Sequence, residues 1–177
     1  ENRIAEIVAK EMGREAEFVW ADDPGIYLVP NYLKEDKCDV ITGVDSGDPR
    51  VATTEAYYRS SYVFVYPKDK GFRIQSLDDP VLRQLKIGVH LLGDDYTNPP
   101  PVHELGRRGV VDNVIGYSTF YSEENLPSRI IEAVTAGDID VAIVWGPVAG
   151  YFAKKQHVPL ELVPVPSGEG DLPFAFD

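Results

Sequence analysis

Three histidines and a pair of adjacent acids are the first side chains of this sequence to consider for chemistry, and none of them forms a known motif. His90, His103 and His157 fall on separate predicted elements, and no second histidine or cysteine stands at the spacing of a zinc ligand set. Asp94 and Asp95 could help to bind a cation, although a solvated loop explains them without any ligand. The sequence contains no phosphate loop, dinucleotide fingerprint or Gly-x-Ser-x-Gly motif. We therefore expect no resident metal or cofactor.

Cys38 is the one cysteine of the chain, and it stands at the head of a predicted apolar strand. One interpretation is a buried free thiol that packs as a small hydrophobic residue. The other is a disulfide to a cysteine in a first strand that this sequence does not contain, because an odd cysteine in an exported fragment suggests a partner elsewhere. A thiol count on the full-length protein, with and without reductant, distinguishes the two interpretations.

Composition limits the partners and the size of the core. The chain has 177 residues, of which 44% are hydrophobic, enough for one large or two small domains. Its net charge of −12 argues against long-range attraction to nucleic acid or to an anionic membrane surface. No run of eighteen apolar residues is present. The chain opens on a helix without the strand that should precede it and closes on the start of a strand at 172–177, so we expect both ends to be cuts in a longer protein.

Residues 136–151 contain the unit that best indicates the architecture. A helix runs into Gly137, an apolar strand follows at 139–145, and Gly146-Pro147 opens the next helix. A fainter copy lies about a hundred residues earlier, where a helix leads into an apolar strand at 38–44. Each copy places Asp-Val before the apolar run. Two such units predict two similar α/β lobes, each with a parallel sheet.

The remaining elements fit this division. In the first lobe we expect a helix at 3–12, a strand at 16–20, a helix at 26–37 and a strand at 38–44. In the second we expect strands at 86–92, 113–117 and 139–145, and helices at 100–109, 127–136 and 147–155. A strand returns at 160–166, and its prolines should keep it from the centre of a sheet.

A long aromatic strand at 57–66 should connect the lobes. Val63 and Val65 face one way along it, and Tyr62, Phe64 and Tyr66 face the other. The sequence therefore predicts an α/β protein whose lobes are residues 1–65 with 163–177 and residues 66–162, joined by a two-strand hinge. A cleft between the lobes is the natural ligand site.

Ligands of open α/β sheets gather at the carboxyl ends of strands, which selects two loops and the aromatic residues beside them. The loops are residues 45–50 and 93–98. Core packing is an equal alternative for the aromatic members of the set. The candidate residues are Asp45, Ser46, Tyr57, Tyr58, Asp94, Asp95 and Trp145.

The order of elements resembles the type II periplasmic solute-binding fold over nearly the whole chain. The matching segments are Cys38-Asp-Val-Ile, residues 50–58, Lys86-Ile-Gly-Val and residues 133–142. In amino-acid binders of this fold an arginine after the third strand holds the ligand carboxylate, and Arg50 lies near the matching place. Those binders also place hydroxyl groups in the loop after Ile-Gly-Val and an acid at the end of the strand that ends here at Trp145. This chain has Asp94-Asp95 in the loop and no charged residue at the end of the strand. We therefore do not expect a free amino acid as ligand.

Two longer segments resemble the MoxJ/XoxJ family, the J proteins of methanol-oxidation gene clusters. They are residues 53–65 and 136–151. The resemblance implies a periplasmic accessory of a PQQ-containing, calcium- or lanthanide-dependent methanol dehydrogenase, with that enzyme as partner and its cytochrome c as a second candidate. It does not imply that this chain binds PQQ or metal.

Three functions compete at this point. We favour a non-enzymatic, chaperone-like binding protein that assists maturation or activation of methanol dehydrogenase by holding part of it in the cleft, because an apolar cleft suits a protein segment. The alternative is a periplasmic solute receptor of an ABC transporter. An enzyme such as a dehydratase is the third, and it would have to use Glu123, Glu124, Asp94 or Asp95 without a nearby histidine.

Overall fold

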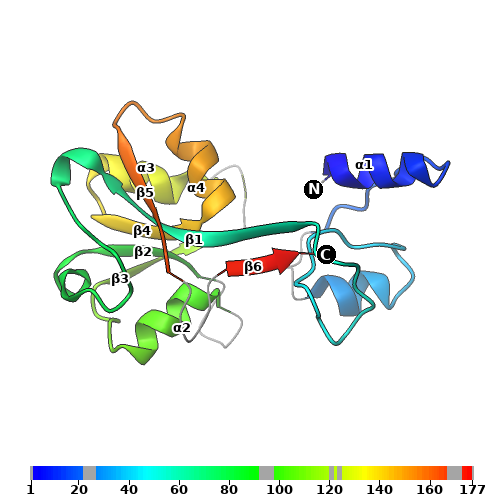
Figure 1. The fold of residues 1–177 in the computed structure, drawn as a ribbon, viewed down its shortest axis with the longest axis horizontal. Coiled ribbons are helices and arrows are strands. Elements are labelled where there is room, and N and C mark those ends of the chain that lie inside the picture. The colour runs from blue at the N-terminus through cyan, green and yellow to red at the C-terminus, as the bar shows by residue number, and fades with distance from the viewer. Residues whose placement is uncertain are drawn as a thin grey trace. The chain divides into compact units, whose positions relative to one another are not determined.

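A computed structural model describes residues 2–21, 27–91, 98–119, 122, 125–166 and 173–176, the last four by their backbone (Figure 1). The chain divides into two compact units. Unit 1 comprises Glu1–Arg59 with Phe174–Asp177, and unit 2 comprises Ser60–Pro173. The two-strand hinge and the cleft remain predictions.

Unit 2 is built on a mixed sheet in the order β3-β2-β4-β1-β5, with β6 (Pro173–Phe176) pairing β1 off this path. Its strands are β1 (Tyr58–Pro67), β2 (Ile87–Leu91), β3 (Val114–Ser118), β4 (Val141–Trp145) and β5 (Leu160–Pro164). β2 runs parallel to β3 and β4, whereas β1 is antiparallel to β4 and β5. The prediction of a purely parallel sheet is therefore wrong. Crossover helices force β2, β3 and β4 to be parallel, but β1 enters from unit 1 without such a crossover.

The alternation predicted for the long strand is confirmed, and it gives each face of the sheet its own core. Phe64 and Tyr66 pack with Leu105 of α2 (Pro100–Arg107). Val63 and Val65 pack on the opposite face, beneath α3 (Arg129–Ala136) and α4 (Gly146–Ala153). Figure 1 shows α3 and α4 on one side of the sheet and α2 on the other. The predicted position of the returning strand is also confirmed, because β5 ends the sheet path.

The unit at 136–151 forms as predicted. Gly137 closes α3 in the left-handed conformation, with a φ of 83°, and its N–H bonds back to the carbonyls of the last turn. Gly146 begins α4 directly after β4. A Cβ at Gly146 would lie 2.8 Å from the backbone oxygen of Ser61, so only glycine lets α4 start this close to β1.

Two 3₁₀ turns lead into β2. A 3₁₀ turn, η3 (Lys68–Lys70), ends at Gly71, and a second, η4 (Pro80–Gln84), is capped by Asp79. The Asp79 carboxylate accepts the backbone N–H of Val81 at 3.1 Å.

Unit 1 departs further from the sequence predictions. The first helix is confirmed as α1 (Asn2–Glu11), but the expected helix at 26–37 is reduced to a π-helical turn, η2 (Val29–Leu33). The strands predicted at 16–20 and 38–44 are wrong, because these residues lack regular strand structure. A strand needs a neighbour to accept its backbone hydrogen bonds, and no described strand pairs with either segment. Trp20 and Val40 are accordingly 77% and 72% exposed.

Candidate functional site

The loop at 45–50 forms two successive turns that bring Arg50 onto an internal carboxylate. Arg50 Nη2 lies 2.6 Å from Asp48 Oδ2, and its Nε lies 3.0 Å from Oδ1. The backbone N–H of Arg50 also donates to Asp48 Oδ1, at 2.9 Å. This is the fork-to-fork pairing that arginine makes with a bound carboxylate. An external carboxylate would therefore find the Nε–Nη2 side of Arg50 already occupied by Asp48.

The two acids of this loop titrate differently. The hydrogen bonds from Arg50 lower the pKa of Asp48 to about 2. Partial desolvation and the Asp48 carboxylate raise the pKa of Asp45, against the opposing effect of Arg50. Asp48 is thus the anion that holds the guanidinium, and the Asp45 carboxylate interacts with the pair through its electrostatic field.

The Arg50–Asp48 ion pair should break at a measurable low pH, when Asp48 becomes protonated. We expect the Asp48 carboxyl to titrate near pH 2 in an NMR pH titration, against an ordinary value of 3.8, and Arg50→Gln to return the midpoint toward 3.8. Because the folded-state pKa is depressed, the pair stabilises the loop fully above about pH 4 and is lost as the pH falls toward 2. A wild-type midpoint near 3.8 would show that Arg50 does not hold Asp48.

The other candidates in unit 1 lie at or near the surface. Ser46 is exposed on the loop, Tyr57 is 40% exposed, and Tyr58 is half-buried at the start of β1. Cys38 is half-buried and its thiol is free among the described residues. A disulfide to a cysteine outside this sequence stays a prediction.

In unit 2 the candidate site is the edge where β2, β3 and β4 end. Leu91 and Ser118 are paired at the ends of β2 and β3, and Trp145 ends β4. The Trp145 ring meets Tyr62 edge to face, with centroids 5.3 Å apart, and stays half-buried. Trp145 therefore packs with one part of its ring and keeps another part accessible, and its place in the cleft stays a prediction. Asp94 and Asp95 lie outside the described residues.

Three residues at this edge were not among the candidate site residues, although Tyr62 and His90 were noted in the sequence. Tyr62 supports Trp145, as its cross-strand neighbour. Burial lowers the pKa of His90, so this histidine stays neutral near pH 7. The hydroxyl oxygen of Thr119 is buried and has no hydrogen-bond partner among the described residues. The available signal for Thr119 was its position as a polar residue two places after the strand predicted at 113–117.

In the part of the chain that the structure describes, no three His, Cys, Asp or Glu side chains are grouped so that they could hold a metal ion. The same part contains no helix long and apolar enough to cross a membrane.

Two solved structures share this architecture and a substantial part of the sequence. MxaJ from Methlophaga aminisulfidivorans is 32% identical with a TM-score of 0.77, over 99% of this chain and 76% of that one. XoxJ, a periplasmic binding protein from Methylobacterium extorquens, is 30% identical with a TM-score of 0.73, over 99% and 72%. This chain belongs to the MoxJ/XoxJ family.

Curated members of the MoxJ/XoxJ family are longer than this chain. Protein MoxJ of Methylorubrum extorquens is 36% identical over 189 residues, which cover 100% of this chain and 62% of that protein. For protein MoxJ of Paracoccus denitrificans the identity is 32%, over 92% of this chain and 60% of that protein. The chain thus spans about three fifths of the length of these relatives. No family model matches it.

The predicted fold class is confirmed by a more distant likeness. The substrate-binding protein of an amino acid ABC transporter has a TM-score of 0.62 over 99% of this chain, at 20% identity. The chain has the type II periplasmic-binding-protein fold, and the MoxJ/XoxJ family is one branch of the proteins that carry it.

Proposed function

We propose that this member of the MoxJ/XoxJ family is a non-enzymatic periplasmic accessory protein of a PQQ-dependent methanol dehydrogenase that uses calcium or a lanthanide. It assists maturation or activation of the enzyme by holding a segment of it in the cleft between the lobes. The dehydrogenase is the partner, and its cytochrome c is a second candidate. A Cys38 disulfide, one of the two interpretations of this cysteine, would suit the oxidising periplasm.

The Arg50–Asp48 pair is the observation that favours a protein client over a small solute. A free anionic solute would need the Arg50 guanidinium, which is already bound in bidentate fashion by a carboxylate two residues away. Displacing Asp48 would leave its carboxylate without a partner, which costs free energy. A small ligand makes few other contacts with which to offset that cost. Among the described candidate residues, the positive charge of Arg50 is thus already engaged.

Aromatic residues supply what a protein client needs instead. Trp145 and Tyr62 form a supported aromatic pair at the strand edge, and Tyr57 offers an exposed ring in unit 1. Large, rigid aromatic side chains dominate the energetics of protein interfaces because they bury much area and lose little entropy. They suit an apolar segment of a partner better than a polar solute.

The second candidate function is a solute receptor of an ABC transporter. The fold shared with the substrate-binding protein of an amino acid ABC transporter favours it. Arg50 would then release Asp48 when the solute binds.

Calorimetric titration of the full-length protein with its cognate dehydrogenase tests the proposal, with a thermal-shift screen of small solutes in parallel. We expect saturable binding of the dehydrogenase and no stabilising solute. A solute that raises the melting temperature, together with no heat from the dehydrogenase, would replace the proposal with the receptor function.

A further inference from the structure

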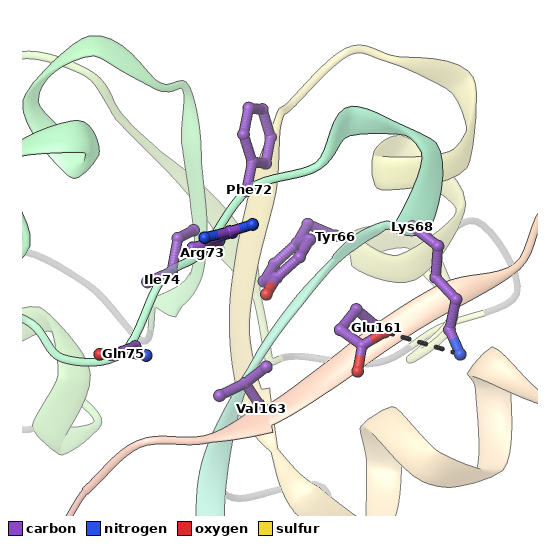
Figure 2. Close-up of a pocket in the computed structure, with 8 residues that line it drawn as sticks. All are labelled: Tyr66, Lys68, Phe72, Arg73, Ile74, Gln75, Glu161 and Val163. Atoms are coloured by element: carbon purple, nitrogen blue, oxygen red, sulfur yellow. Dashed lines mark ion pairs between the residues drawn. The ribbon is translucent and has the colours of Figure 1, made fainter.

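A shallow hollow on unit 2 lies well away from the Trp145 edge. Its volume is about 270 Å³, and it runs between residues 72–75 on one side and Glu161 and Val163 of β5 on the other, with Tyr66 as its floor (Figure 2). We call it the β5 groove. Tyr62 pairs with Trp145, and Tyr66 lies four residues further along β1, so the groove is on the order of 13 Å from that edge.

The floor of the β5 groove is rigid and apolar. Tyr66 is only 4% exposed, and its ring meets Phe72 edge to face with centroids 5.8 Å apart. Burial, followed by the charge of Glu161, raises the pKa of Tyr66, so its hydroxyl stays protonated at physiological pH. The groove therefore has its shape before any ligand arrives.

Two of the charged side chains along the β5 groove pair with each other, and a third has no partner among the described residues. Lys68 Nζ lies 3.5 Å from Glu161 Oε2, so these two side chains largely neutralise one another. Arg73 and Gln75 are exposed and make no hydrogen bond or ion pair with any other described residue. Arg73 and Gln75 both line the groove (Figure 2). The Arg73 N–H groups and the Gln75 amide are therefore donors that a ligand can use.

Size and charge together define what this groove accepts. Small-molecule pockets usually measure about 300–1,000 Å³, and a hollow of about 270 Å³ is better matched to one side chain of a partner. A guanidinium with an adjacent amide donor selects a carboxylate, and the aromatic floor accommodates the methylene groups beneath it. The chain carries a net charge of −12, so an acidic partner needs a local cation to approach.

We propose that the β5 groove docks an aspartate or glutamate side chain on the surface of the dehydrogenase, with Arg73 holding its carboxylate. This inference rests on the proposed function for the identity of the partner, and it adds a second contact outside the predicted cleft. Because Arg73 is exposed, its substitution should leave the fold intact.

The test compares two charge reversals in the full-length protein by calorimetric titration with the dehydrogenase. Arg73→Glu and Lys154→Glu change the net charge equally, and Lys154 is exposed at the end of α4, outside the groove. We expect Arg73→Glu to weaken binding about tenfold and Lys154→Glu less than about twofold. Arg73→Lys should fall between wild type and Arg73→Glu, because lysine keeps the charge but not the fork.

Each other outcome has a distinct meaning. If both charge reversals weaken the affinity for the dehydrogenase equally, the effect comes from net charge alone. The inference about the groove is then overturned, while the proposed function stands. Saturable binding of glutarate with an unchanged dehydrogenase affinity in Arg73→Glu would make the groove a small-molecule site and also overturn the inference. If the wild-type protein does not bind the dehydrogenase, the proposed function fails and the groove inference fails with it.

Discussion

Gly88→Ala is expected to lower the free energy of unfolding by about 1–3 kcal/mol. Gly88 is the second residue of β2, and a Cβ there would clash with Ile139 Cδ1 and stand 3.3 Å from Tyr117 and 3.4 Å from Ile130. Ile139 and Ile130 are each 1% exposed, so neither can move aside without disturbing the core beneath α3. Thermal unfolding should show a melting temperature about 3–10 °C below wild type.

Gly106→Ala is the matched control for this substitution. Gly106 is exposed in α2, and a Cβ there would meet nothing within 4 Å. The same chemical change should therefore stabilise the protein, by up to about 1 kcal/mol, because alanine favours the helix. An unchanged melting temperature for Gly88→Ala would mean that β2 and α3 are not packed as closely as described.

Trp145→Ala is expected to weaken binding of the dehydrogenase by at least about tenfold. Trp145 ends β4, is held edge to face by Tyr62, and presents its remaining surface at the edge where ligands of such sheets gather. Truncation of an aromatic residue at an interface centre typically costs about 2 kcal/mol or more. Calorimetric titration measures the loss, and Trp145→Phe should retain part of the affinity.

Tyr151→Ala provides the comparison for Trp145→Ala. Tyr151 is an aromatic residue of the same unit, 57% exposed on α4, and its removal should change the affinity less than about twofold. Circular dichroism of both variants separates lost binding from lost folding. A folded Trp145→Ala variant with wild-type affinity would leave Trp145 a packing role only.

Unit 2 could be predicted well from the sequence because its signals are local. Gly137 and Pro147 mark the helix ends on either side of β4, and the alternation of Val63 and Val65 with the aromatic residues fixes the two faces of β1. Strand direction is not a local property. The reversal of β1 between β4 and β5 depends on where the chain enters the sheet, which no pattern within residues 58–67 encodes.

Unit 1 shows the limit of such patterns. Residues 16–20 and 38–44 have strand-like composition, yet composition forms a strand only where a neighbouring strand pairs with it. The helix α1 needs no such partner for its backbone hydrogen bonds, so the sequence predicted it correctly.

The candidate site stays a prediction, and only part of its local geometry could be foreseen from the sequence. The rule that ligands collect at strand ends selected the loop at 45–50 and Trp145, but the resemblance to amino-acid binders drew attention to Arg50 and an external carboxylate. Asp48, two residues before Arg50, was visible in the sequence, and the pairing depends on the turn that brings the two side chains together. Thr119 was harder to find, because burial of its hydroxyl depends on tertiary packing.

The most direct test of the central claim is a calorimetric titration of the full-length protein against the apo and the holo form of its cognate dehydrogenase. An accessory that assists maturation must bind the immature enzyme better, since a ligand shifts an equilibrium only through differential affinity. We therefore predict tighter binding of the apo form. Equal binding of both forms would contradict a role in maturation, and no binding of either at high concentration would contradict the account as a whole.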